Sequence, residues 1–193
     1  LQVFRDLFSS EVLRPGEEIS VGSTTLMFTD LRNSTRLYRE IGDAPAFGRV
    51  REHFEILEQA IAEEGGSIVK TMGDSVMAAF RNPASAVRAI WDVQKQLSAR
   101  GEPPLSIKAG IHHGPCIVVN LNDRLDYFGS TVNIAARLPH FSQGGEVVLS
   151  EPIRNDPEVI AFLEKSAAPN SVSRFQSEIR GFDTSMESWK IRM

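Results

Sequence analysis

The stretch KTMGDSVMAAF, residues 70–80, places a glycine between two short apolar segments. SIVK (67–70) and SVMAAF (75–80) lie on either side of Gly73, and their brevity predicts a β-hairpin. Lys70 and Asp74 flank the predicted turn. The two charges have two open explanations: a local ion pair at a turn, or side chains that serve chemistry.

Two long helices are expected, one on each side of this hairpin. Asp43 and Pro45 indicate a helix start, and Gly65-Gly66 indicate its end. The second helix begins at Asn82-Pro83, where the asparagine can cap it. Spacings of three and four residues predict the inward-facing side chains, which are Phe47, Val50, Phe54, Leu57 and Ile61 in the first helix and Ala86, Ile90, Val93 and Leu97 in the second.

The remaining apolar segments are typical of strands. The continuous run STTLMFTD (23–30) predicts a strand buried on both faces. LSIKAGIHHG and PCIVVNL predict a strand pair around Gly114, and STVNIAARL predicts a helix capped by Ser130 or Thr131. Further strands are expected at RLDYFG, GEVVLS, SEIRGF and ESWKIR. This order of elements favours an α+β or α/β sandwich with helices on one face of the sheet.

Composition limits the classes of partner. With 193 residues and 41% hydrophobic content, the chain can bury one sizeable core. A net charge of −4 offers no basic surface for nucleic acid, and no apolar run is long enough for membrane contact by this domain. The single cysteine, Cys116, fits a buried hydrophobe in a reducing compartment, so a cytoplasmic location is expected. Residues 1–22 are interpreted as a lead-in from a missing upstream region, which could hold a regulatory domain or a membrane anchor.

Two aspartates are candidate metal ligands. Asp30 closes the first predicted strand, and Asp74 follows the hairpin turn. If these strands are neighbours, the two carboxylates can meet at one end of the sheet. Such a pair suits Mg²⁺, which completes its shell with phosphate oxygens and water. Taken singly, Asp30 could instead cap a helix, and Asp74 could be a turn residue or a partner of Lys70.

Other polar residues have weaker signals when each is taken alone. Asn133 and Arg137 are four positions apart and therefore share a helix face, and Asp126 lies on the strand before that helix. The alternative is a solvated arginine beside a polar asparagine. The neighbours His112 and His113 would point to opposite faces of a strand, so ordinary packing is expected there rather than a shared metal site.

Four motifs in this order, MFTDL, KTMGDSVMAAF, AGIHHGP and DYFGSTVNIAAR, resemble the catalytic domain of class III adenylyl and guanylyl cyclases. The resemblance runs from about residue 24 to the end of the chain and suggests a catalytic domain at 23–193. It implies a ferredoxin-like sandwich with a mainly antiparallel sheet and helices on one face. It also implies a head-to-tail homodimer whose active sites take residues from both protomers.

The resemblance assigns a role to each matching residue. It implies that Asp30 and Asp74 hold two Mg²⁺ or Mn²⁺ ions and that Lys70 and Asp126 read the purine base. Asn133 would orient the ribose, and Arg137 would stabilise the transition state. Lys108 and Arg180 match loosely defined basic residues that hold the triphosphate. The chain departs from the common pattern at LRNST after Asp30 and at Ser130, and neither departure removes a ligand.

These residues predict an adenylyl cyclase that converts ATP to 3′,5′-cyclic AMP and pyrophosphate. Adenine offers a donor beside an acceptor, which suits an Asp126 acceptor and a Lys70 donor, whereas guanine reverses that pattern. Two alternatives stay open: a guanylyl cyclase, and a catalytically weak domain of the same fold that senses nucleotide. A sensor would be expected to have lost a metal aspartate, Asn133 or Arg137, and all of these are present.

Overall fold

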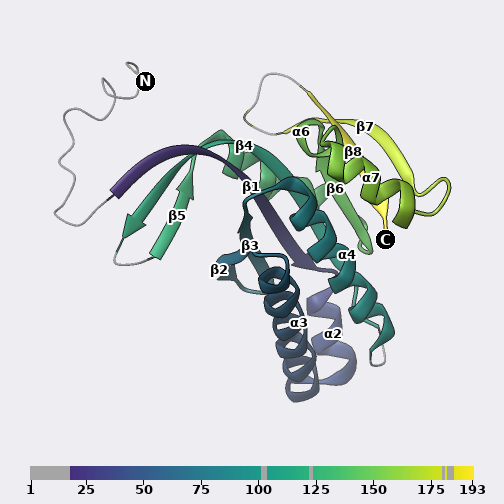
Figure 1. Cartoon of the computed structure of the whole chain (residues 1–193). Helices are drawn as coiled ribbons and strands as arrows, with labels where there is room; N and C mark the ends of the chain where they lie inside the picture. Colours follow the sequence, from purple (N-terminus) through teal and green to yellow (C-terminus); the bar gives the residue numbers. More distant parts are fainter. Residues whose placement is uncertain (1–17, 101–103, 122–123, 180, 182–184) are drawn as a thin grey trace.

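The computed structural model describes residues 18–100, 104–121, 124–179, 181 and 185–193. In this part of the chain the strands form one eight-stranded sheet of order β2-β3-β1-β4-β6-β8-β7, and β5 pairs with β4 outside that order (Figure 1). The strands are β1 (Glu18–Leu31), β2 (Ser67–Met72), β3 (Ser75–Phe80), β4 (Ile107–Leu121), β5 (Arg124–Phe128), β6 (Glu146–Ser150), β7 (Val172–Ser177) and β8 (Met186–Arg192). Among the described pairs, only β4 with β6 is parallel, which confirms the mainly antiparallel sheet.

The longer helices cover one face of this sheet. The helices are α2 (Ser34–Ile41), α3 (Asp43–Glu63), α4 (Pro83–Ala99), α5 (Ser130–Arg137), α6 (Glu151–Arg154) and α7 (Pro157–Ser166), with a 3₁₀ turn, η1 (Leu138–Phe141). The largest core cluster joins α3, α4 and α7 to Met27 and Leu31 of β1. The alternate β1 residues Leu26 and Phe28 pack on the opposite face with Ala135 of α5. The α+β fold of the prediction is confirmed, and α5 with η1 covers part of the second face.

The strand pair expected around Gly114 is instead one continuous strand, β4, which pairs with β1 along 14 positions from Ile107 to Asn120. Gly114 has no turn to make. A Cβ at this position would lie 2.8 Å from Oγ1 of Thr131 at the start of α5. The glycine is therefore required by the close approach of α5 to the strand. In the sequence, a glycine required for this reason cannot be told from a glycine in a turn.

Other boundaries also differ from the prediction. β1 begins at Glu18, ahead of the expected strand start at residue 23. α5 has Gly129 at its N-cap rather than Ser130 or Thr131, because the Thr131 hydroxyl donates to the Pro115 carbonyl instead. β7 precedes the strand expected at SEIRGF, and α2, α6 and α7 were not expected.

One predicted core residue lies outside the core. Phe47 is 63% exposed, although the helix pattern placed it inward. The buried stripe of α3 runs instead through Ala46, Val50, His53 and Leu57, so Phe47 lies about a quarter turn away from the sheet. In the described ranges, no helix is long and apolar enough to span a membrane.

Candidate active site

Asp30 and Asp74 lie at the same end of two neighbouring strands. β1 pairs with β3, and Thr29 with Val76 is the last pair of this ladder before the two aspartates. The Ser75 hydroxyl donates to Oδ1 of Asp30 at 2.9 Å, which ties the end of β1 to the start of β3. Gly73 adopts φ +63°, a left-handed conformation that suits glycine and closes the turn just before Asp74.

The charges of Asp30 and Asp74 both affect the pKa of His53, a buried histidine that sequence analysis did not single out. Burial lowers the pKa of His53 to about 4, whereas the charges of Asp74 and Asp30 raise it. Of the two charges, that of Asp74 has the larger effect on the pKa of His53. The only sequence signal for His53 is a polar residue on the inward stripe of α3.

Lys70 and Asp126 form an ion pair within one chain. Nζ of Lys70 lies 2.9 Å from Oδ1 and 3.1 Å from Oδ2 of Asp126, although the residues are 56 positions apart. Desolvation raises the pKa of Asp126, but hydrogen bonds from Lys70 and from the Tyr127 backbone, with the Lys70 charge, outweigh it and leave the pKa below its ordinary value. The aspartate is therefore an anionic acceptor at neutral pH.

An irregularity in β2 helps to place Lys70. The pairing with β3 shifts between Ile68 and Lys70, so Val69 is an extra residue in the strand. Val69 packs with Leu26 and Met77 on the face that α5 also covers. Lys70 pairs with Met77, whose side chain lies on that same face. The bulge thus allows two successive residues of β2 to point toward β5.

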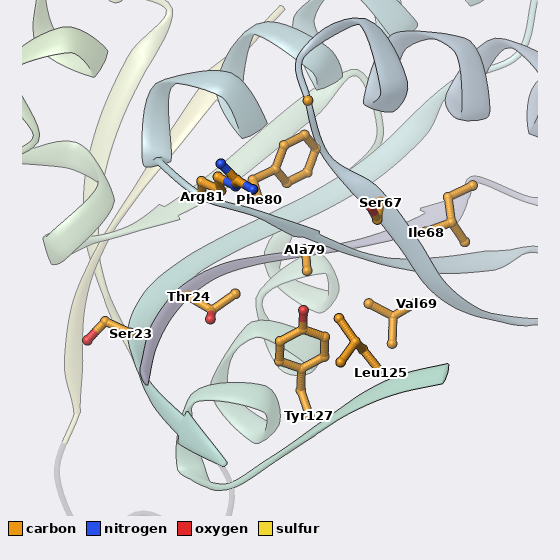
Figure 2. A pocket seen from close by; sticks show the side chains of 11 residues that line it. Ser23, Thr24, Ser67, Ile68, Val69, Ala79, Phe80, Arg81, Leu125 and Tyr127 are labelled. Carbon is orange, nitrogen blue, oxygen red and sulfur yellow. The ribbon is translucent and has the colours of Figure 1, made fainter. Parts of the chain in front are cut away.

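A hollow of about 760 Å³ lies between the β2–β3 hairpin and β5. In Figure 2, Val69 of β2 and the β5 residues Leu125 and Tyr127 point toward one another across it. These three residues are the sequence neighbours of Lys70 and Asp126. Neither Lys70 nor Asp126 lines the hollow itself, and on β5 the lining residues Leu125 and Tyr127 alternate with Asp126.

Helix α5 presents Asn133 and Arg137. Asn133 is exposed and Arg137 half-buried, and in the described structure neither side chain has a hydrogen-bond or ion-pair partner. Lys108 of β4 pairs in register with Asp30, and opposed residues of an antiparallel pair project to the same face. Arg180, the second expected triphosphate residue, lies outside the described residues.

The described side chains form two groups, one around Asp30, Asp74 and Lys108 and the other around Lys70 and Asp126. Within the described ranges, no three His, Cys, Asp or Glu residues lie close enough to hold a metal ion. Two carboxylates alone do not make a closed metal cage. They fit Mg²⁺, which usually takes one or two protein carboxylates and keeps water or substrate phosphate as its other ligands.

This fold and these residues define a class of protein, the nucleotide cyclases. The family model of the adenylate and guanylate cyclase catalytic domain matches residues 17–191, and the chain belongs to this family.

Curated relatives are similar along most of the chain. An adenylate cyclase of Lachancea kluyveri is 29% identical over 194 residues, which cover 86% of this chain and 10% of that protein. An adenylate cyclase of Mycosarcoma maydis is 30% identical over 157 residues, which cover 69% of this chain and 6% of that protein. The chain thus spans a tenth or less of these two relatives.

Solved structures share the fold. The adenylyl cyclase CyaB from P. aeruginosa superposes with a TM-score of 0.71 at 24% identity, over 91% of this chain and 96% of that one. The guanylate cyclase domain of RhGC from Catenaria anguillulae, solved with GTP, has a TM-score of 0.71 at 17% identity, over 89% of this chain and 97% of that one. Because both specificities occur on the same fold, the base must be argued from side chains.

Proposed function

We propose that this domain is an adenylyl cyclase that converts ATP to 3′,5′-cyclic AMP and pyrophosphate with divalent metal ions. The observation that carries the proposal is the Lys70–Asp126 pair, which holds a donor and an acceptor side by side. Adenine presents its amino donor beside an acceptor nitrogen and matches this pair. Guanine in the same pose would set its carbonyl oxygen against Asp126, at a cost of roughly 1–3 kcal/mol per mismatched group.

The reaction forms a bond between the ribose 3′-oxygen and the α-phosphorus and breaks the bond from that phosphorus to the pyrophosphate oxygen. The 3′-hydroxyl loses its proton, and negative charge develops around phosphorus. Asp30 and Asp74 would hold two Mg²⁺ or Mn²⁺ ions. When bound, these ions lower the pKa of the hydroxyl and neutralise the phosphate charge.

The remaining residues bind and orient the substrate. Arg137 would direct a permanent positive charge toward the α-phosphate, and Asn133 would fix the ribose for in-line attack. Their side chains are unpartnered in the described structure, which leaves both free to meet a nucleotide. Lys108 and Arg180 would hold the triphosphate tail.

We further propose a homodimer in which each site takes the metal group from one chain and the base, ribose and arginine groups from the other. Lys70 and Asp74 are only four positions apart, on either side of the β2–β3 turn. Lys70 is paired with Asp126 on β5, whereas Asp74 has no side-chain hydrogen bond in the described structure. This difference between Lys70 and Asp74 supports the proposal that the two residues belong to two different active sites of a twofold dimer.

The test is incubation of the purified domain with ATP or GTP and Mg²⁺ or Mn²⁺, with cyclic nucleotide and pyrophosphate measured. We expect cyclic AMP and pyrophosphate in equal amounts, and a lower kcat/KM with GTP. The Asp30→Asn variant should lose this activity while it stays folded, because its half-buried carboxylate lies at the end of a strand. Preferential cyclic GMP formation would identify a guanylyl cyclase, and tight ATP binding without turnover would identify a nucleotide sensor.

A further inference from the structure

Strand β4 has a gap along one of its two edges. On the first edge it pairs with β1 from Ile107 to Leu31's neighbours and onward to Asn120 without a break. On the second edge it pairs with β6 at residues 108–111 and with β5 at residues 117–121. Residues 112–116 therefore have no strand partner on the second edge in the described structure. Backbone polar groups in such a gap need partners of another kind.

The N-terminal end of α5 supplies a partner for this gap. Thr131 is 2% exposed, and its hydroxyl donates to the Pro115 carbonyl at 2.5 Å. The same Oγ1 atom would lie 2.8 Å from a Cβ at Gly114, so the helix rests directly on the backbone of the strand at this point. No side chain caps α5. The hydroxyl of Thr131 therefore bonds to the strand rather than to its own helix.

The C-terminal end of α5 also meets β4 at a glycine. A Cβ at Gly110 would overlap Leu138 and Pro139 of η1, which directly follows α5. Gly110 and Gly114 are four positions apart and so lie on the same face of the strand. The contact at Gly110 limits only how closely the helix approaches. The hydrogen bond of Thr131 is directional, so it also fixes where the helix lies along the strand.

The same part of β4 places the base-recognition pair. Asp126 of β5 pairs with Val119, which is four positions beyond Pro115 on β4. A single residue separates the end of β5 from the start of α5, so the direction of α5 from that point decides where Arg137 lies relative to Asp126. Arg137 follows Thr131 by six residues in the same helix. One strand is therefore the common support of the aspartate and the arginine.

We propose that Thr131 is a positioning residue for Arg137: its hydrogen bond to Pro115 holds α5 where the guanidinium reaches the α-phosphate of a nucleotide whose base is bound at Asp126. This inference rests on the proposed cyclase function. Arg137 would act on charge that develops in the transition state, so its displacement should lower kcat more than it raises KM. A misplacement of about 1 Å can cost about 100-fold in rate.

The experiment compares two threonine-to-valine variants by steady-state kinetics with ATP and Mn²⁺. Thr131→Val keeps the shape of the side chain without the donor and should lower kcat about 10-fold, with KM changed less than about twofold. Thr131→Ser keeps the hydroxyl and should restore most of kcat.

Thr25→Val is the matched control. Thr25 is 0% exposed, and the substitution removes a hydrogen bond to His113. Because its neighbour Leu26 packs on the α5 face of the sheet, Thr25 points to the opposite face. The control therefore loses a buried hydroxyl and its bond without any change beneath α5, and the folded variant should keep the kcat of the wild type.

Two results would overturn the inference: wild-type kcat in folded Thr131→Val, or an equal fall of kcat in Thr131→Val and Thr25→Val. If Thr131→Val does not fold, Gly114→Ala takes its place, because its Cβ would press on the same Oγ1 atom and displace α5. Arg137→Ala, measured in parallel, separates this inference from the proposed function. Unchanged kcat in Arg137→Ala would remove the proposed role of the arginine itself, whereas a loss there with no loss in Thr131→Val would remove only the role of Thr131.

Discussion

At the scale of single residues, Lys70 and Asp126 already form hydrogen bonds with each other in the absence of nucleotide. Their side chains are 41% and 34% exposed, so solvent screens the pair and its contribution to folding is small. A base that binds at this pair would exchange one set of hydrogen bonds for another rather than fill vacant positions. The pair therefore favours selection between bases more than it favours tight binding.

The Lys70→Met variant separates these two effects. Loss of the donor should reduce kcat/KM for ATP roughly 10-fold or more, because the base loses a charged partner. The free energy of unfolding should fall by less than about 1 kcal/mol, since the ion pair is exposed. Steady-state kinetics and urea denaturation measure the two quantities. An unchanged ratio of ATP to GTP turnover would place base recognition elsewhere.

Candidate site residues in local motifs could be named from sequence, whereas their contacts in the folded chain could not. KTMGD, DYF and the helix after it give Lys70, Asp74, Asp126, Asn133 and Arg137 by position. The hydrogen bond between Lys70 and Asp126 needed the fold, because it depends on a bulge in β2 and on the course of β5. His53 carried no motif at all, and only its complete burial in the folded chain distinguishes it.

At the scale of elements, the β2–β3 turn separates the two groups of site residues. Gly73 has φ +63°, and nothing lies within 4 Å of the point that a Cβ would occupy, so a side chain there would meet open space but a strained backbone. Asp74 follows it directly. The conformation of one glycine thus fixes the direction in which Asp74 leaves the turn.

Gly73→Ala should therefore lower the free energy of unfolding by about 1 kcal/mol, from the left-handed backbone alone. Gly73→Asn should cost less, because asparagine tolerates this region better. Both are measured by chemical denaturation, and cyclase activity should decline in the same order. Equal stability of the wild type and Gly73→Ala would mean that the turn adjusts freely and does not direct Asp74.

Elements with local signals were predicted well, and those set by contacts between distant segments were not. The caps and apolar spacing of α3 and α4 gave their bounds to within a few residues. Gly114 misled the prediction of β4, since a glycine required by an approaching helix looks the same in sequence as one required by a turn. Phe47 misled it as well, because a helix can place its buried stripe on alanine and histidine and leave the larger ring outside.

At the scale of the whole molecule, the proposed twofold dimer makes each active site a property of two chains. Asp30→Ala and Arg137→Ala homodimers should each be inactive, since one lacks a metal ligand and the other the transition-state arginine. A mixed dimer would contain one doubly damaged site and one intact site. With random exchange, half of the dimers are mixed and half of their sites intact, so activity should recover to about a quarter of wild type.

The measurement is cyclic AMP formation after equilibration of the two variants, with subunit exchange confirmed independently. Each variant equilibrated with itself is the control. Exchange without recovery would show that the site is built within one chain.

The order of strands in the sheet has a consequence for how the protein acquires its activity during folding. β2 and β3 are adjacent in sequence and can pair early, so the turn that holds Asp74 is a local structure. β1 pairs with β4, which is distant in sequence, and Lys70 pairs with Asp126, which lies 56 residues further along the chain. Loop closure over such separations is slow, so we expect the base-recognition pair to form in a late folding step. A partly folded chain would then contain its hairpin but recognise no nucleotide, so the gain of base selectivity would report that the central sheet is complete.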